Sequence, residues 1–134
     1  MINATELRLG NYILHKAGVR ILPVQIEFRH FELLSKGMAK EMFPVVLKAD
    51  VLVKAGFIEN KKYHLLPEAR EFVLTLPVRG VHKNEISAYI NSNNECYARA
   101  TVNDIIITNN FYNLHQLQNV YYALTGAEME ITLG

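Results

Sequence analysis

The last quarter of the chain carries the strongest local signal in the sequence, an amphipathic helix with a marked start and stop. Asn113 is a preferred N-cap residue, Gln116 stands where a capping box needs it, and Gly126 suits the left-handed conformation that ends many helices. Between them, apolar side chains recur every three or four residues, at Leu114, Leu117, Val120, Tyr121 and Leu124. This spacing predicts a helix near residues 114–125 with one face in a hydrophobic core.

The opposite face of this helix is polar and carries one aromatic ring. Its members lie three or four residues apart and can meet on the helix surface: His115, Gln118, Asn119 and Tyr122. If exposed, such a set is a candidate interaction face for a protein partner or for self-association. Alternatively, a neighbouring strand or loop covers it, and the polar groups satisfy that segment's backbone. The sequence leaves both interpretations open.

Two runs in the first third of the chain predict a hairpin. A short strand near residues 12–15 is followed by a turn at Gly18. Residues 19–34 are then rich in strand formers, with apolar and polar positions alternating, which predicts a long second strand. Gly37 interrupts residues 35–43, which we interpret as a loop or a short strand.

A short helix and an antiparallel meander are expected in the middle of the chain. Residues 47–55 predict about two helical turns, closed by Gly56. Beyond them, short segments separated by turn-forming residues predict strands at 61–66, 71–76, 85–90, 95–101 and 105–108. The alternation over residues 128–133 fits a closing strand.

Together these elements predict an α+β fold, mainly antiparallel sheet, with the C-terminal helix lying across the sheet. A length of 134 residues, half of them hydrophobic, is enough for one domain whose core needs no metal or disulfide. We expect residues 1–134 to form that single domain. Within it, an N-terminal hairpin lobe of about residues 1–43 would pack on an α+β body of about residues 44–134.

Charge and cysteine content argue against several classes of function. The net charge of +1 lacks the basic surplus typical of proteins that grip nucleic acid through phosphates. Cys96 is the only cysteine, so no internal disulfide can form, and its alternating segment favours a buried small hydrophobic residue over a nucleophile. No apolar run reaches membrane-spanning length and no secretion signal opens the chain, so a cytoplasmic location without membrane contact is expected.

Local catalytic and ligand-binding signatures are missing from the sequence. The five histidines are never three or four residues apart, and no Cys-x-x-Cys, phosphate-cradling glycine loop or Gly-x-Ser-x-Gly motif occurs. We therefore expect no cofactor, no metal and no catalytic residue that the sequence can name. An enzyme would need a pocket assembled from distant side chains.

One further cluster is a candidate for base stacking. Tyr97 and Arg99 lie on the same face of the predicted strand at 95–101, and Tyr89 lies across the predicted hairpin. Exposed aromatic rings beside a basic side chain can stack on nucleic-acid bases. The same three residues also fit the cross-strand packing pairs of an ordinary antiparallel sheet.

Three motifs are spread over nearly the whole chain: Glu6-Leu-Arg-Leu-Gly-Asn-Tyr-Ile13, Leu47-Lys-Ala-Asp-Val-Leu-Val-Lys-Ala-Gly-Phe57, and His115-Gln-Leu-Gln-Asn-Val-Tyr-Tyr-Ala-Leu-Thr-Gly126 with Glu128 after it. In order and spacing they resemble those of a family of small uncharacterised bacterial proteins, often carried by prophages or other mobile elements. Lys48 and Val51 depart from the pattern, where the family has a helix-capping Thr and a packing Trp. The resemblance implies a shared fold and a mobile-element context, and it assigns no activity or site.

The leading functional hypothesis is a non-enzymatic interaction or accessory module that acts through protein contacts. It follows from the missing catalytic spacing together with a polar, aromatic helix face and a sheet with free edges. The alternative is a nucleic-acid-binding accessory protein that uses the sheet tyrosines. A small enzyme with a site not visible in the sequence is the third.

Overall fold

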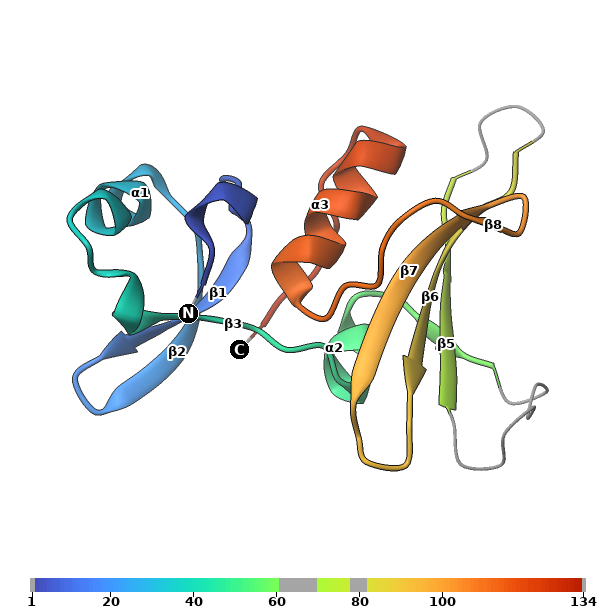
Figure 1. Ribbon diagram of the computed structural model, residues 1–134, viewed down its shortest axis with the longest axis horizontal. Coiled ribbons are helices and arrows are strands. Elements are labelled where there is room, and N and C mark those ends of the chain that lie inside the picture. The colour runs from blue at the N-terminus through green and yellow to red at the C-terminus, as the bar shows by residue number, and fades with distance from the viewer. Residues whose placement is uncertain (1, 61–69, 78–81, 134) are drawn as a thin grey trace.

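The computed structural model describes residues 2–60, 70–77 and 82–133 of the chain (Figure 1). Those residues form two antiparallel sheets and three α-helices, so the expected α+β class with mainly antiparallel sheet is confirmed. The smaller sheet has the strand order β2-β1-β3, and the larger sheet is a meander in the order β4-β5-β6-β7-β8. In Figure 1, α3 lies between the two sheets.

The N-terminal lobe is built on a hairpin of β1 (Tyr12–Ala17) and β2 (Arg20–Gln25). A third strand, β3 (Met42–Pro44), pairs with the other side of β1. Two short 3-10 helices, η1 (Ala4–Glu6) and η2 (Ala39–Glu41), stand before β1 and β3. The lobe has a small core of its own, made of Ile2, Ile13, Ile26 and Met42.

The long second strand predicted over residues 19–34 is wrong, because β2 ends at Gln25 and a helix, α1 (Phe28–Ser35), follows it. A capping box starts this helix, and in it the backbone N–H of Glu27 donates to Nδ1 of His30 at 2.8 Å. The helix packs three apolar side chains against the lobe core: Phe31, Leu33 and Leu34. Capping and one-sided burial therefore outweigh the strand propensity of this run.

The larger sheet confirms the predicted meander. Its strands are β4 (Ile58–Glu59), β5 (Arg70–Thr75), β6 (Asn84–Ile90), β7 (Cys96–Val102) and β8 (Ile105–Ile106). β4 was not expected, since two residues are too few for alternation to show. The strand predicted at 61–66 lies outside the described residues. Asn103 and Asp104 both have positive φ, 51° and 66°, as the tight turn between β7 and β8 requires.

The closing strand predicted over residues 128–133 is wrong. This segment is irregular and runs back along the main core, where Met129 is buried and Ile131 and Leu133 pack beside it. Alternating polarity reports that one side of a segment is buried. It does not supply the neighbouring strand that a ladder of backbone hydrogen bonds needs.

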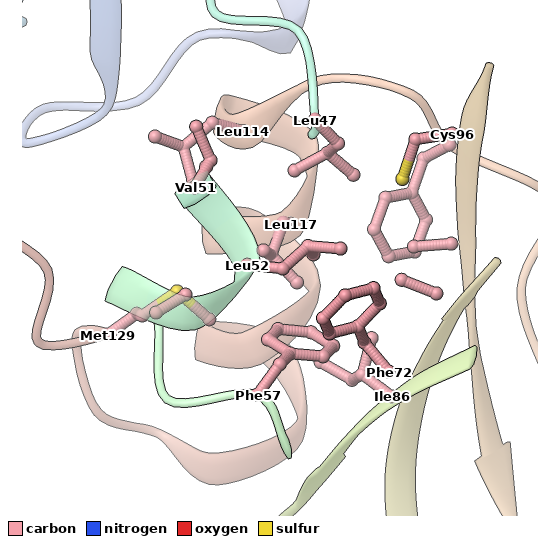
Figure 2. Close-up of a cluster of buried hydrophobic side chains, with 14 of the residues drawn as sticks. Leu47, Val51, Leu52, Phe57, Phe72, Ile86, Cys96, Leu114, Leu117 and Met129 are labelled. Carbon is pink, nitrogen blue, oxygen red and sulfur yellow. The ribbon is translucent and has the colours of Figure 1, made fainter. Parts of the chain in front are cut away.

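Two helices cover one face of the larger sheet and close the main core (Figure 2). The shorter one, α2 (Ala49–Lys54), begins at Lys48 without a side-chain cap, so its packing must hold it. Side chains from both helices, the sheet and the chain around them meet in this core, among them Leu47, Val51, Leu52, Phe57, Phe72, Ile86, Cys96, Leu114, Leu117 and Met129.

The C-terminal helix α3 (Leu114–Thr125) confirms its prediction in detail. In its capping box, Oε1 of Gln116 accepts a hydrogen bond from the backbone N–H of Asn113 at 3.1 Å. Gly126 ends the helix with a φ of 73°, in the left-handed region. The predicted apolar stripe faces the main core, with Leu114 and Leu117 fully buried.

We expect His30 to make the lobe sensitive to acid. Its side chain is fully buried, and its pKa lies below the usual 6.5 because burial, and then the positive charges of Arg29 and His15, oppose protonation. The unfolded chain therefore takes up this proton at a higher pH than the folded chain does. Stability that is present above a pH of about 6.5 is lost as the pH falls toward the folded-state pKa, by at most about 1.4 kcal/mol per pH unit for one group. Urea unfolding at about pH 7.5 and about pH 5.5 measures this loss.

The matched control is His30→Gln, because a glutamine keeps an acceptor for the N–H of Glu27 but does not titrate. We expect the variant to lose less stability than the wild type between the two pH values. An equal loss in both proteins would show that another group causes the acid sensitivity.

Candidate functional site

The polar face of α3 does not point to solvent, because the chain segment 6–12 lies across it. His115 is 1% exposed and Gln118 is 2% exposed, and Asn119 is half-buried. Only Tyr122, at 43%, is markedly exposed. The structure thus brings the four residues of the candidate interaction face together as the seam between the N-terminal lobe and α3.

Gln118 is the most fully used of these side chains. Its Oε1 accepts a hydrogen bond from the backbone N–H of Tyr12 at 2.8 Å, and its Nε2 donates to the carbonyl oxygen of Gly10 at 3.3 Å. Water does not reach the backbone buried at the start of β1, so these two bonds satisfy its polar groups instead. One amide group therefore serves a donor and an acceptor of the same segment.

Asn119 bonds the same segment from the next position on the helix. Its Nδ2 donates to the carbonyl oxygen of Glu6 at 2.7 Å. Its Oδ1 accepts from Nδ2 of Asn11 at 2.9 Å and from Nε of Arg8 at 3.2 Å. Asn11, itself fully buried, also accepts from the backbone N–H of Arg8 at 2.7 Å. These bonds link three side chains and the backbone of Glu6 and Arg8 into one network.

The two ends of the face are closed by charged side chains. Nε2 of His115 lies 3.1 Å from Oε2 of Glu6. At the other end, the guanidinium of Arg8 lies 4.3 Å from the centre of the Tyr122 ring and forms an ion pair with Glu128. The aromatic ring of this face is thus stacked under a residue of the same chain.

The second predicted cluster also comes together, on the sheet face turned away from the helices. Tyr89 and Tyr97 are directly opposite in the β6–β7 register, and their ring centres are 5.2 Å apart at an interplanar angle of 30°. The guanidinium carbon of Arg99 lies 5.2 Å from the centre of the Tyr89 ring. Their chain neighbours Ala88 and Ala98 are fully buried in the core, which places all three side chains on the outer face. All three are half-buried.

A shallow groove of about 570 Å³ adjoins this cluster on the same outer face, a feature that the sequence did not indicate. It is lined by residues of β4, β5 and β6 and their flanks: Ile58, Glu59, Asn60, Glu71, Val73, Thr75, Lys83 and Glu85. Of its carboxylates, Glu59 pairs with Arg70 at 2.8 Å and Glu85 with Lys83 at 2.9 Å, whereas Glu71 accepts a hydrogen bond from the side-chain amide of Asn60 at 3.4 Å. The pKa of Lys83 is raised, chiefly by its hydrogen bond to Glu85.

Possible metal ligands are not clustered in the part of the chain that the structure describes. No group of three His, Cys, Asp or Glu residues among residues 2–60, 70–77 and 82–133 is placed to hold a metal ion. Cys96 is buried, as predicted, and burial raises the pKa of its thiol to about 11. A thiol with this pKa is protonated at neutral pH, and the thiolate is the nucleophilic form.

The β8 edge of the larger sheet is a surface that the sequence did not locate, although free sheet edges were expected. Ile105, Ile106 and Ile107 are 68%, 51% and 46% exposed, in and just after β8. The sequence predicts a strand here, but whether that strand lies inside the sheet or at its edge depends on the order of strands. The only local signal is the run of three isoleucines after the Asn-Asp turn.

Removing the Gln118 side chain should weaken the seam between lobe and helix. We expect Gln118→Ala to lower the free energy of unfolding by about 1–3 kcal/mol, since the buried N–H of Tyr12 loses its acceptor. Gln25→Ala is the matched control, because the amide of Gln25 also bonds the carbonyl of Gly10 at 3.3 Å but is exposed. This control should change stability by less than about 0.5 kcal/mol. Equal losses of unfolding free energy in urea would show that the buried bonds of Gln118 do not stabilise the contact between the lobe and α3.

Comparison with protein-family models, with curated proteins and with solved structures found no match to this chain. Within the described residues, no helix is both long enough and apolar enough to cross a membrane. Function must therefore be inferred from the surfaces that the fold leaves open.

Proposed function

We propose that this protein is a non-enzymatic interaction module that acts through protein contacts, as an accessory protein of a bacterial prophage or other mobile element, in the cytoplasm. The observation that carries the proposal is the exposed edge of the larger sheet, where three consecutive isoleucines face solvent. The mobile-element context comes from the resemblance of the three sequence motifs.

Exposed sheet edges are normally protected, because their unpaired backbone groups can pair with another chain. Proline and charged residues are the usual protection, and β2, an edge strand of the smaller sheet, has Pro23 near its middle. Residues 105–110 contain neither a proline nor a charged residue. An unprotected edge with adjacent aliphatic side chains is typical of a surface that another protein covers.

The groove on the outer face of the larger sheet has a chemistry that supports binding over catalysis. In the groove beside β4, Glu59 and Glu85 are held by neighbouring cations, and the Cys96 thiol is buried on the far side of the sheet. A general base needs a carboxylate or imidazole that is free to take a proton from a substrate. In this groove Glu59 and Glu85 are in ion pairs, Glu71 accepts from the Asn60 amide, and the position is shallow and open.

The test compares two isoleucines on opposite edges of the same sheet. Ile106→Lys puts a charge on the β8 edge, and Ile58→Lys, at a position 75% exposed, puts the same charge on the β4 edge. We expect a partner that is captured from bacterial lysate, identified and purified to bind Ile106→Lys at least about tenfold more weakly than wild type, with little change for Ile58→Lys. Equal affinity of all three proteins for every purified partner would refute the proposed edge.

Nucleic-acid binding is the second candidate function, favoured by the outward-facing set of Tyr89, Tyr97 and Arg99. The two rings already stack on each other, and a base could extend that stack. Glu71, directly opposite Tyr89 on β5, places a carboxylate beside the rings and disfavours a phosphate backbone there. Protein contact therefore ranks first.

Fluorescence anisotropy with single-stranded DNA and RNA at low ionic strength tests this second function. We expect Tyr97→Ala to weaken binding by about 1–3 kcal/mol if a base stacks there, and Arg99→Gln to reduce the salt dependence. Phe28→Ala, which removes a 78% exposed aromatic ring on α1 of the N-terminal lobe, is the control. No binding by the wild type, even at low salt, removes the candidate.

A further inference from the structure

We propose that the β8 edge binds a second copy of this chain, with the two β8 strands antiparallel across a two-fold axis. The inference rests on the proposed function and names its partner. It extends the larger sheet of one molecule into that of the next. Three features of the edge lead to it: the direction of its backbone groups, the order of its side chains and the position of its charge.

The backbone of β8 offers one residue to a new strand. Ile105 lies opposite Val102 next to the tight turn, and the N–H of Ile107 donates to the carbonyl oxygen of Ala100 at 3.0 Å. In an antiparallel ladder, alternate residues turn their N–H and C=O groups toward the same neighbour. Residues 105 and 107 therefore bond β7, and Ile106 between them points both backbone groups away from the sheet.

A two-fold axis through this position makes the edge complementary to itself. Ile106 and the partner's Ile106 would form a hydrogen-bonded pair, each donating its N–H to the other's carbonyl oxygen. On either side, Ile105 would lie opposite the partner's Ile107 in a non-hydrogen-bonded pair, where side chains are closest. Each exposed isoleucine of this run thus meets an isoleucine of the other copy.

Charge fixes the direction of the pairing. Asp104 lies at one end of the strand, and Thr108, Asn109 and Asn110 lie at the other, with no charged residue between. An antiparallel copy places Asp104 against the uncharged, hydrogen-bonding end of the partner. A parallel copy in register would place Asp104 beside the partner's Asp104, and this repulsion disfavours it.

The end of β8 at Thr108 limits how long the contact between the two β8 strands can become. The hydroxyl of Thr108 accepts a hydrogen bond from the N–H of Ala100 at 3.0 Å, where a regular strand would use a carbonyl. Phe111 then rejoins β7 opposite Ala98, so residues 108–110 bulge out of the ladder. The contact between the two β8 strands is therefore only about three residues long, and we expect a weak, concentration-dependent dimer.

Cysteine cross-linking tests the geometry directly. The α-carbons of a hydrogen-bonded antiparallel pair lie about 5.5 Å apart, within the range that a disulfide spans. We expect Ile106→Cys to form a covalent dimer under mild oxidation, and Ile58→Cys on the opposite edge to remain monomeric on non-reducing gels. The native Cys96 is buried and should not react. Cross-linking of Ile58→Cys to the same extent would overturn the proposed pairing of the two β8 strands.

Register is tested by mixing two variants. Because Ile105 faces the partner's Ile107, an equimolar mixture of Ile105→Cys and Ile107→Cys should cross-link several-fold more than either variant alone. Equal yields from the mixture and from each single variant would overturn the two-fold register.

Sedimentation velocity of the full chain tests the association without cross-links. We expect the wild type and Ile58→Lys to shift toward a dimer as concentration rises, and Ile106→Lys to stay monomeric with an unchanged thermal midpoint, since position 106 is half-exposed. A wild type that is monomeric throughout overturns the self-pairing. If such a monomer still binds an identified partner that Ile106→Lys loses, the proposed function survives alone, and if it binds none, both fail.

Discussion

The helix α3 is held on two sides, and the arrangement of the rest of the molecule depends on this. Leu114 and Leu117 enter the main core, while Gln118 and Asn119 turn to the segment 6–12 and bond its backbone. Apolar contacts tolerate small rotations, whereas amide groups that serve both a donor and an acceptor fit in one orientation. The core therefore anchors the helix, and the amide groups set the angle at which the lobe sits on it.

This use of the polar helix face decides which surfaces remain for other molecules. With His115 and Gln118 enclosed, the open features of the described residues include the outer face of the larger sheet and the free edges of both sheets. The edges differ in a way that matters physically: Pro23 interrupts the donors of β2, and β8 has no comparable interruption. The β8 edge is thus distinguished by lacking the protection that Pro23 gives to β2, as well as by its own exposed isoleucines.

The parts of the fold that the sequence predicts are those whose signals are local. The cap, period and stop of α3 lie within fourteen residues, and the β6–β7 hairpin that stacks Tyr89 on Tyr97 closes through a short turn. The helix α1 escapes prediction because Glu27 and His30 are unusual capping residues and its apolar face has meaning only against the lobe core. The covering of the α3 polar face and the exposure of β8 both depend on distant segments, which periodicity cannot report.

The bonds between the segment 6–12 and α3 join the two ends of the chain, with partners separated by 106 to 113 positions. During synthesis the lobe can complete its own small core long before α3 has been made, since Ile2, Ile13, Ile26 and Met42 all lie in the first third of the sequence. The buried side of β1 that later meets Gln118 must then stay uncovered until α3 has been synthesised. Assembly of the two halves is thus a long-range step, and the loop that it closes spans more than a hundred residues.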